Sequence, residues 1–226
     1  MEKNKLIIIT GASGGLGLNI LKYFSTHHKV LAIYNKNKPK FINSNITYLR
    51  IDFLKKIKIN IKYLNFQNIV LINLASIKKD GLLINYSLKN WRDVFKVNVE
   101  SNFEITKIIL KQMINNKWGR VINFSSSDGS KGDVGTAAYT SSKLAIHGIN
   151  KVISKEYAKF NITSNVLLLG NFNFGMFKSL SRVKQNESRT TSRFSVEADS
   201  FNPKVLQRPE RISLIVQVKS SYLASS

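Results

Sequence analysis

Residues 10–17 read Thr10-Gly11-Ala12-Ser13-Gly14-Gly15-Leu16-Gly17, and they decide the fold. The stretch follows a short apolar run at residues 6–9 and precedes helical periodicity over residues 16–25. We therefore expect a strand, a tight glycine turn and a helix, which is the start of a βαβ unit. Repeated units of this kind build a parallel sheet with helices on both of its faces.

The glycines in this stretch have separate predicted tasks. Gly11 permits the tight turn, Gly15 lets the backbone approach a pyrophosphate, and Gly17 lets the helix pack on the strand. The N-terminus of a helix presents free N–H groups and a positive dipole end, and both favour a phosphate group. The stretch thus predicts a dinucleotide site in which Gly11, Ser13, Gly15, Leu16 and Gly17 contact the pyrophosphate.

The rest of the chain alternates short apolar runs with longer amphipathic stretches, which is typical of an α/β fold with a doubly wound parallel sheet of Rossmann type. We expect one domain over residues 1–226. Further strands are predicted at residues 30–34, 46–51, 69–74, 121–124 and 163–168, and long helices at 88–115, with Ser87 as its N-cap, and 137–160.

The composition narrows the function. The chain has no cysteine, which excludes disulfides, cysteine-ligated zinc and a thiol nucleophile. The net charge of +22 allows two interpretations, a polyanion partner or a general enrichment of lysine over the surface. Because the lysines are scattered, we expect no specific nucleic acid, but we expect a preference for anionic ligands such as a phosphorylated cofactor. No apolar stretch reaches the length of a membrane span, so we expect a cytoplasmic protein without membrane contact.

Other residues are candidates for the adenosine half of a dinucleotide site. Asp52 follows the third predicted strand, and Asn73 and Ala75 mark the end of the fourth. The second strand ends without the acidic residue that would hold a ribose 2′-hydroxyl of NAD, whereas Lys36 and Lys38 follow it. We therefore predict NADP over NAD, with Lys36 near the 2′-phosphate. The alternatives are that Asp52 and Asn73 only form turns and that both lysines only face solvent.

Tyr139 and Lys143 are four residues apart in a predicted helix and therefore lie on one face. A tyrosine has a pKa of about 10, and a nearby ammonium group favours the phenolate, so the pair can act as a general acid or base. Ser126 follows the fifth predicted strand, where its hydroxyl can polarise a substrate oxygen. Asn98 lies inside an amphipathic helix, where it is predicted to hold a water that relays protons to Lys143, or else to be a surface residue.

Together these motifs resemble the short-chain dehydrogenase/reductase family, whose compact members have a TGxxxGxG loop and a YxxxK pair. The resemblance covers about residues 5–178. It implies a seven-stranded sheet, a nicotinamide cofactor, and a catalytic set of Asn98, Ser126, Tyr139 and Lys143, in which Lys143 and Tyr139 also contact the cofactor. The stretch Lys79-Asp80-Gly81-Leu82-Leu83 resembles 3-oxoacyl-[acyl-carrier-protein] reductases. The substrate is accordingly expected to be a small or acyl-carrier-linked carbonyl compound, and the protein a homodimer or homotetramer.

The C-terminal part departs from this family. Gly170 retains a glycine expected near the cofactor, but Phe174 stands where the family usually has a threonine. Residues 179–211 have weak apolar periodicity and are predicted to be a mobile lid or disordered. The usual seventh strand is predicted to be missing or degenerate, because the chain stops soon after residues 220–223. The altered end leaves oligomer formation open and suggests an alternative function as a non-catalytic, cofactor-binding or scaffolding protein.

Overall fold

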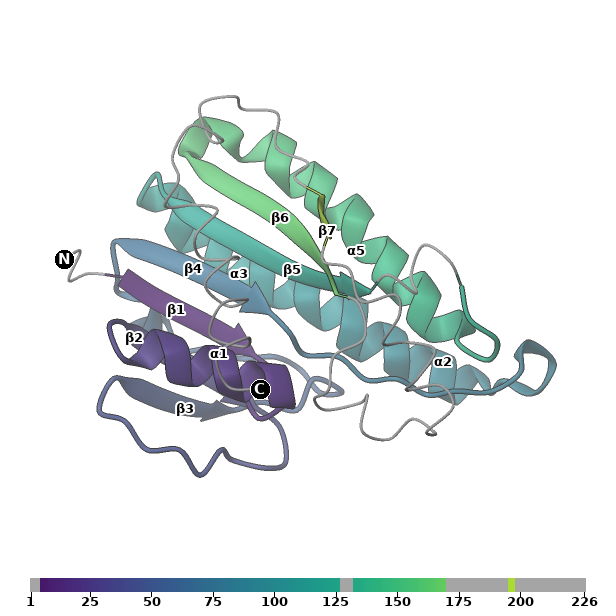
Figure 1. Cartoon of the computed structure of the whole chain (residues 1–226). Coiled ribbons are helices and arrows are strands. Elements are labelled where there is room, and N and C mark those ends of the chain that lie inside the picture. The colour runs from purple at the N-terminus through teal and green to yellow at the C-terminus, as the bar shows by residue number, and fades with distance from the viewer. Residues whose placement is uncertain (1–4, 127–131, 170–194, 198–226) are drawn as a thin grey trace.

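The computed structural model describes residues 5–126, 132–169 and 195–197. They form one sheet in the order β3-β2-β1-β4-β5-β6-β7, with helices on both faces (Figure 1). Strands β1 to β6 run parallel to one another, as the alternation of apolar runs and helices predicts. They comprise β1 Lys5–Thr10, β2 Lys29–Tyr34, β3 Ile46–Arg50, β4 Asn68–Asn73, β5 Gly119–Ser126 and β6 Ile162–Leu169.

The sheet divides the hydrophobic core into two layers, and helices cover each of them. Helix α1 (Gly15–Ser25) covers one face of the sheet, where Ile20, Leu21 and Phe24 pack on side chains of β1 and β2. Helices α3 (Ser101–Asn115) and α5 (Ala137–Glu156) cover the other face (Figure 1), and Ile109 of α3 is fully buried there. Strands covered on both faces are apolar throughout, which explains why Ile7, Ile8 and Ile9 are all buried.

The order of the strands places the functional edge. The chain runs outward from β1 to β3, then returns to β4 on the other side of β1 and runs outward again. In such sheets, ligands bind beyond the carboxyl ends of the strands, at the point where the direction of winding reverses. That point lies between Thr10 at the end of β1 and Asn73 at the end of β4, which are partners in the sheet.

The crossover between β3 and β4 is short, as the few residues between Asp52 and Asn73 predict. It contains a single turn of 3₁₀ helix, Ile61–Leu64, rather than an α-helix. The side chain of Asn60 caps this turn by accepting a hydrogen bond from the backbone N–H of Lys62 at 3.0 Å. Leu64 and Ile57 are buried, so this segment closes the core without a full helix.

The long helix predicted over residues 88–115 exists, but it is not uniform. Helix α2 (Leu88–Phe95) is capped by Ser87 as predicted, and a π-helical turn, Lys96–Glu100, joins it to α3. The helix predicted over residues 137–160 ends earlier, at Glu156, and a 3₁₀ turn, Ala158–Phe160, follows it.

The sheet has a seventh strand among the described residues, but the segment after residues 220–223, in which the usual last strand was predicted to be missing or degenerate, lies outside them. Strand β7 (Ser195–Glu197) has three residues and pairs antiparallel with β6. It lies within the range 179–211 that was predicted to be a lid or disordered, and the other residues of that range lie outside the described part of the chain. Within the described ranges, no helix is both long enough and apolar enough to cross a membrane.

Candidate active site

The glycine turn has the geometry that its sequence predicts. Gly11 has a φ of +69°, and a Cβ atom there would lie 2.9 Å from the backbone of Ala75. A Cβ atom on Gly17 would lie within 3.0 Å of Ala12 and would collide with the carbonyl oxygen of Gly11. Both glycines are therefore required, one by the turn and the close approach of β4, the other by the contact between α1 and the turn.

The start of α1 fits an anionic group. Its N-cap is Gly14, and no side chain caps the first turn of the helix. Ser13 and Gly14 are exposed, while Ala12 beneath them is buried and donates a backbone hydrogen bond to Ile33 at 3.0 Å. The backbone thus holds the turn from below and presents the helix N-terminus to solvent, where a pyrophosphate would bind.

Thr10 joins the glycine turn to the end of β4. Its hydroxyl oxygen accepts hydrogen bonds from the backbone N–H groups of Leu74 at 3.0 Å and Ala75 at 3.1 Å. This role of Thr10 was not predicted from the sequence, although its position as the last residue of β1 indicates where its side chain acts. Thr10 is buried, and its two hydrogen bonds hold the end of β1 next to the segment that follows β4. These two segments border the predicted dinucleotide site.

The side chain of Asn73 lies in the core. It donates hydrogen bonds to Asn123 at 3.0 Å and Thr106 at 3.3 Å, and both partners are buried. These bonds belong to a buried polar network that continues through Asn102 and Asn150. Asn73 therefore supports β4, β5 and α3 from within, and any cofactor contact that it makes would come from its backbone.

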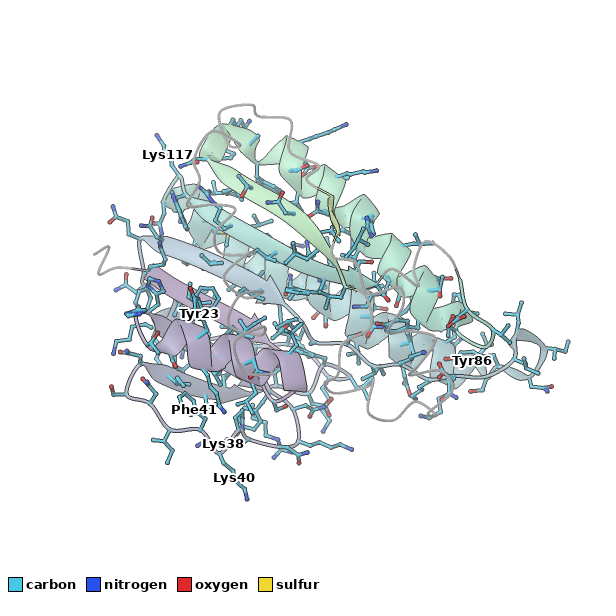
Figure 2. All side chains as sticks on the ribbon, in the orientation of Figure 1. Tyr23, Lys38, Lys40, Phe41, Tyr86 and Lys117 are labelled. Carbon is cyan, nitrogen blue, oxygen red and sulfur yellow. The ribbon has the colours of Figure 1, made fainter. Side chains whose placement is uncertain are left out.

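The predicted adenosine residues lie at the edge of the molecule. Lys36 and Lys38 are exposed on the loop after β2, and Figure 2 shows Lys38 on the outer edge beside β3. The ammonium group of Lys38 lies 5.2 Å from the centre of the Tyr48 ring. Asp52 lies two residues after β3 ends, where its carboxylate accepts a hydrogen bond from the backbone N–H of Leu54 at 3.1 Å. The turn-forming role of Asp52 is thus present in the structure.

Ser126 is the last residue of β5. It was predicted to follow the strand, but the strand extends to Ser126 instead of ending at Phe124. Tyr139 and Lys143 lie on α5, which packs along β5, and both are buried. The ammonium group of Lys143 lies 5.6 Å from the centre of the Tyr139 ring. It also donates a hydrogen bond to the carbonyl oxygen of Phe124 at 2.9 Å. The sheet edge and α5 therefore bring the predicted acid–base pair to the end of β5.

Burial changes the ionisation of Lys143. Its side chain is removed from water, which lowers the pKa of its ammonium group from 10.5 to about 8. Lys143 is therefore mainly protonated near neutral pH and close to its titration range. A buried cation beside a tyrosine ring favours the phenolate form of that tyrosine.

Asn98 is buried, and its side chain makes hydrogen bonds to Ile77 and Ser142. It lies in the π-helical turn. Its side-chain oxygen accepts a hydrogen bond from the backbone N–H of Ile77 at 2.8 Å, and its NH₂ group donates to the Ile77 carbonyl and to Ser142 Oγ, both at 3.0 Å. Asn98 thus ties the segment after β4 to α5, and both of its N–H donors are occupied by protein atoms. The predicted water would therefore have to donate to an oxygen atom of Asn98 rather than accept from its NH₂ group, because an amide oxygen can accept a second hydrogen bond.

Ser142 is a further residue of the site that was not predicted from the sequence. This buried residue lies between Tyr139 and Lys143 on α5, where it accepts the hydrogen bond from Asn98 and donates to the carbonyl of Tyr139 at 2.7 Å. A serine inside a helix gives little signal in sequence. Gly170 and Phe174 lie outside the described residues.

These features define a class of protein: an α/β oxidoreductase with a dinucleotide turn after β1 and a tyrosine–lysine pair at the end of β5. The model of the short chain dehydrogenase family matches residues 5–185. The chain belongs to that family, and it is an NAD(P)-dependent oxidoreductase.

Individual proteins similar to this chain support the family assignment. The chain is similar to a 3-oxoacyl-[acyl-carrier-protein] reductase, FabG, of Buchnera aphidicola subsp. Baizongia pistaciae, with 31% identity over 190 residues that cover 79% of this chain and 78% of the relative. A protein of the same name from Aquifex aeolicus is 27% identical over 241 residues, covering 99% and 92% of the two chains. A solved structure, 4-hydroxyisoleucine dehydrogenase complexed with NADH, is 27% identical with a TM-score of 0.61, covering 72% of this chain and 74% of its own.

Proposed function

We propose that this protein reduces the 3-oxo group of an acyl thioester to a 3-hydroxyl group, with NADPH as the hydride donor. The observation that carries the proposal is the joint placement of Tyr139 and Lys143 on the face of α5 next to the end of β5. The resemblance of Lys79–Leu83 to 3-oxoacyl reductases and the relatives of that name support the acyl thioester as substrate.

The protein supplies the proton in this reaction. When bound at the glycine turn, NADPH would supply a hydride, with its two electrons, to the carbonyl carbon of the substrate. Tyr139 gives the phenolic proton to the carbonyl oxygen, so that a C–H and an O–H bond form as the C=O π bond is lost. Ser126, at the end of β5, donates a hydrogen bond to the same oxygen and orients it. Lys143 stabilises the phenolate that remains on Tyr139 until solvent returns a proton.

The chain's own residues also support the dinucleotide. Gly11 and Gly17 hold the turn, and the exposed Ser13 and Gly14 precede a helix whose N–H groups favour phosphate. The proposal of NADPH over NADH depends on Lys36 and Lys38, which are exposed beside the expected adenosine end and lie on the loop after a strand that ends without an acid. One 2′-phosphate contact from a lysine contributes about 1–3 kcal/mol as a charge-assisted hydrogen bond.

The proposal is tested by following the oxidation of NADPH by absorbance with acetoacetyl-CoA as a soluble 3-oxoacyl thioester. We expect turnover with this substrate, and slower turnover with simple ketones that lack the thioester. Parallel assays with NADH measure the cofactor preference, and the double variant Lys36→Ala, Lys38→Ala measures its source. Equal kcat/KM for the two cofactors in the unmodified protein would refute the assignment of NADPH. Binding of NADPH without reduction of any 3-oxo compound would favour the non-catalytic scaffolding alternative.

A further inference from the structure

A second ammonium group lies beside the Tyr139 ring. Lys143 reaches the ring from the same helix, with its Nζ atom 5.6 Å from the ring centre. Lys78 reaches it from the segment after β4, and its Nζ atom lies 5.7 Å from that centre. The two distances are equal within 0.1 Å, although the two lysines come from different parts of the chain.

The segment that carries Lys78 is fixed on both sides by hydrogen bonds. Asn98 holds both backbone groups of Ile77, and the Tyr86 hydroxyl donates to the carbonyl of Lys79 at 2.7 Å. The backbone N–H of Gly81 donates to Gly135, just before α5, at 2.9 Å. Figure 2 shows Tyr86 at the end of the molecule where α2 and α5 meet. The backbone around Lys78 is therefore held in place by these hydrogen bonds.

The other charged groups of this region lie on the same segment as Lys78, on α2, on the π-helical turn and on the loop before α5. Lys78 lies 3.6 Å from the carboxylate of Asp80, whose side chain is 59% exposed. On α2, Asp93 pairs with Lys79 and Lys89. On the π-helical turn, Lys96 pairs with Glu100 and Glu104, and Asp133 lies on the loop before α5. Lys78 and Lys143 both lie over the Tyr139 ring, with their Nζ atoms 5.7 and 5.6 Å from its centre.

We propose that Lys78 is a positioning residue for proton transfer, a second cation that stabilises the Tyr139 phenolate together with Lys143. A phenolate spreads its negative charge over the oxygen and the ring, so a cation within about 6 Å of the ring centre stabilises it more than it stabilises the neutral phenol. The exposed Asp80 carboxylate weakens this effect, because it partly neutralises Lys78. The role in turnover rests on the proposed reductase function, whereas the effect on Tyr139 does not.

The test is a titration of Tyr139 by NMR, in the full-length protein labelled with ¹³C at the Cζ atom of tyrosine. The Tyr139 signal is assigned by its loss in Tyr139→Phe. In Lys78→Met, we expect the midpoint of the Tyr139 titration to rise by about 0.5–1 pH unit, as expected for a charge at this distance in a partly solvated site. Lys78→Arg should restore the midpoint, because it restores the positive charge.

Two further variants make the test specific. Lys107→Met removes an exposed lysine whose Nζ atom lies 5.9 Å from the Phe103 ring, so it matches the loss of charge and ring contact away from the site. It should leave the Tyr139 midpoint unchanged. Asp80→Asn should lower the midpoint, because it removes the counter-charge of Lys78. Since Asp80 is mostly exposed, this variant tests the proposal without disturbing the core.

The titration and the kinetics separate two kinds of failure. If NADPH is oxidised by acetoacetyl-CoA, the limb of the kcat–pH profile that reports Tyr139 should move in Lys78→Met in the same direction as the NMR midpoint. If no carbonyl compound is reduced, the proposed function fails while the NMR titration still decides the effect of Lys78. An unchanged midpoint in Lys78→Met, or a midpoint in Lys78→Arg no different from that in Lys78→Met, would refute the proposal.

Discussion

Lys143 donates a hydrogen bond from its Nζ atom to the main-chain carbonyl of Phe124 at 2.9 Å, two residues before the end of β5. Ser125 reinforces the contact, because its hydroxyl donates to the Lys143 carbonyl at 3.2 Å. Helix α5 is thus bonded to β5 at the residue that carries the cation. The position of the ammonium group beside Tyr139 is therefore set by the sheet as well as by the helix.

Tyr139→Phe removes only the phenolic oxygen and keeps the ring's packing. We expect turnover to fall about 100-fold or more, the usual contribution of a positioned general acid, with cofactor binding nearly unchanged. Steady-state kinetics and fluorescence titration of NADPH measure the two effects. A variant that retains most of its turnover would contradict the assigned role.

Lys143→Met should reduce both turnover and NADPH affinity, and it should also change how stability depends on pH. Because burial lowers the pKa of Lys143 to about 8 in the folded protein, the unfolded chain holds that proton more tightly. The burial cost is therefore fully present below pH 8, and folding stability rises relative to the variant as the pH increases from about 8 to 10.5, by about 3 kcal/mol in total.

Urea unfolding of the unmodified protein and of Lys143→Met at several pH values measures this difference. Subtracting one curve of unfolding free energy against pH from the other cancels the contributions of groups that titrate equally in both proteins. A difference that stays constant from pH 7 to pH 10.5 would show that the lysine is well solvated in the folded state, contrary to the structure.

Ser126→Ala removes a hydroxyl at the end of β5 but no part of the glycine turn. We expect kcat to fall while the affinity for NADPH stays within about twofold, because one neutral hydrogen bond to the substrate contributes about 0.5–1.5 kcal/mol in the ground state and more in the transition state. The kinetics should be compared with those of Ser13→Ala, which alters the exposed turn instead. An equal loss of NADPH affinity in both variants would contradict the separation of these two roles.

Gly17→Ala tests the contact between α1 and the glycine turn. The added Cβ atom would collide with the Gly11 carbonyl, so we expect a loss of about 1–3 kcal/mol in stability and weaker NADPH binding. Gly148→Ala is the matched control, because it lies on the exposed side of α5 with nothing within 4 Å of the added atom. It should stabilise the protein by about 0.5–1 kcal/mol. Thermal unfolding distinguishes the two outcomes, and equal effects would contradict the packing argument.

The parts of the fold that depend on local pattern could be predicted from sequence. The glycine turn, the six parallel strands and the Ser87 cap follow from apolar runs, glycine spacing and a capping residue, all of which act over a few residues. The short crossover after β3 could be predicted from the small number of residues between Asp52 and Asn73. The Tyr139–Lys143 pair could also be found, because four-residue spacing on a helix fixes their common face.

What sequence could not supply are contacts between distant residues. The bonds from Asn98 to Ile77 and Ser142 join residues 21 and 44 positions apart, and nothing local to Asn98 identifies its partners. The same holds for Thr10, whose partners lie 64 and 65 residues away. The roles of Lys36, Asp52 and Gly170 at the cofactor stay predictions, as do the homo-oligomer, the cytoplasmic location and the lack of a nucleic-acid partner, because they concern ligands and surroundings beyond this chain.

The π-helical turn at Lys96–Glu100 has a consequence for the length of the chain around it. A π turn holds one residue more than an α-helical turn, and each residue of a helix advances the side chains by about 100°. Deleting one residue there would convert the π turn into an ordinary α-helical turn, so α3 would keep Ile105, Ile109 and Met113 in the core. The extra residue is therefore absorbed within the turn, and its loss should disturb Asn98, whose hydrogen bonds to Ile77 and Ser142 depend on its place in that turn, more than the packing of α3.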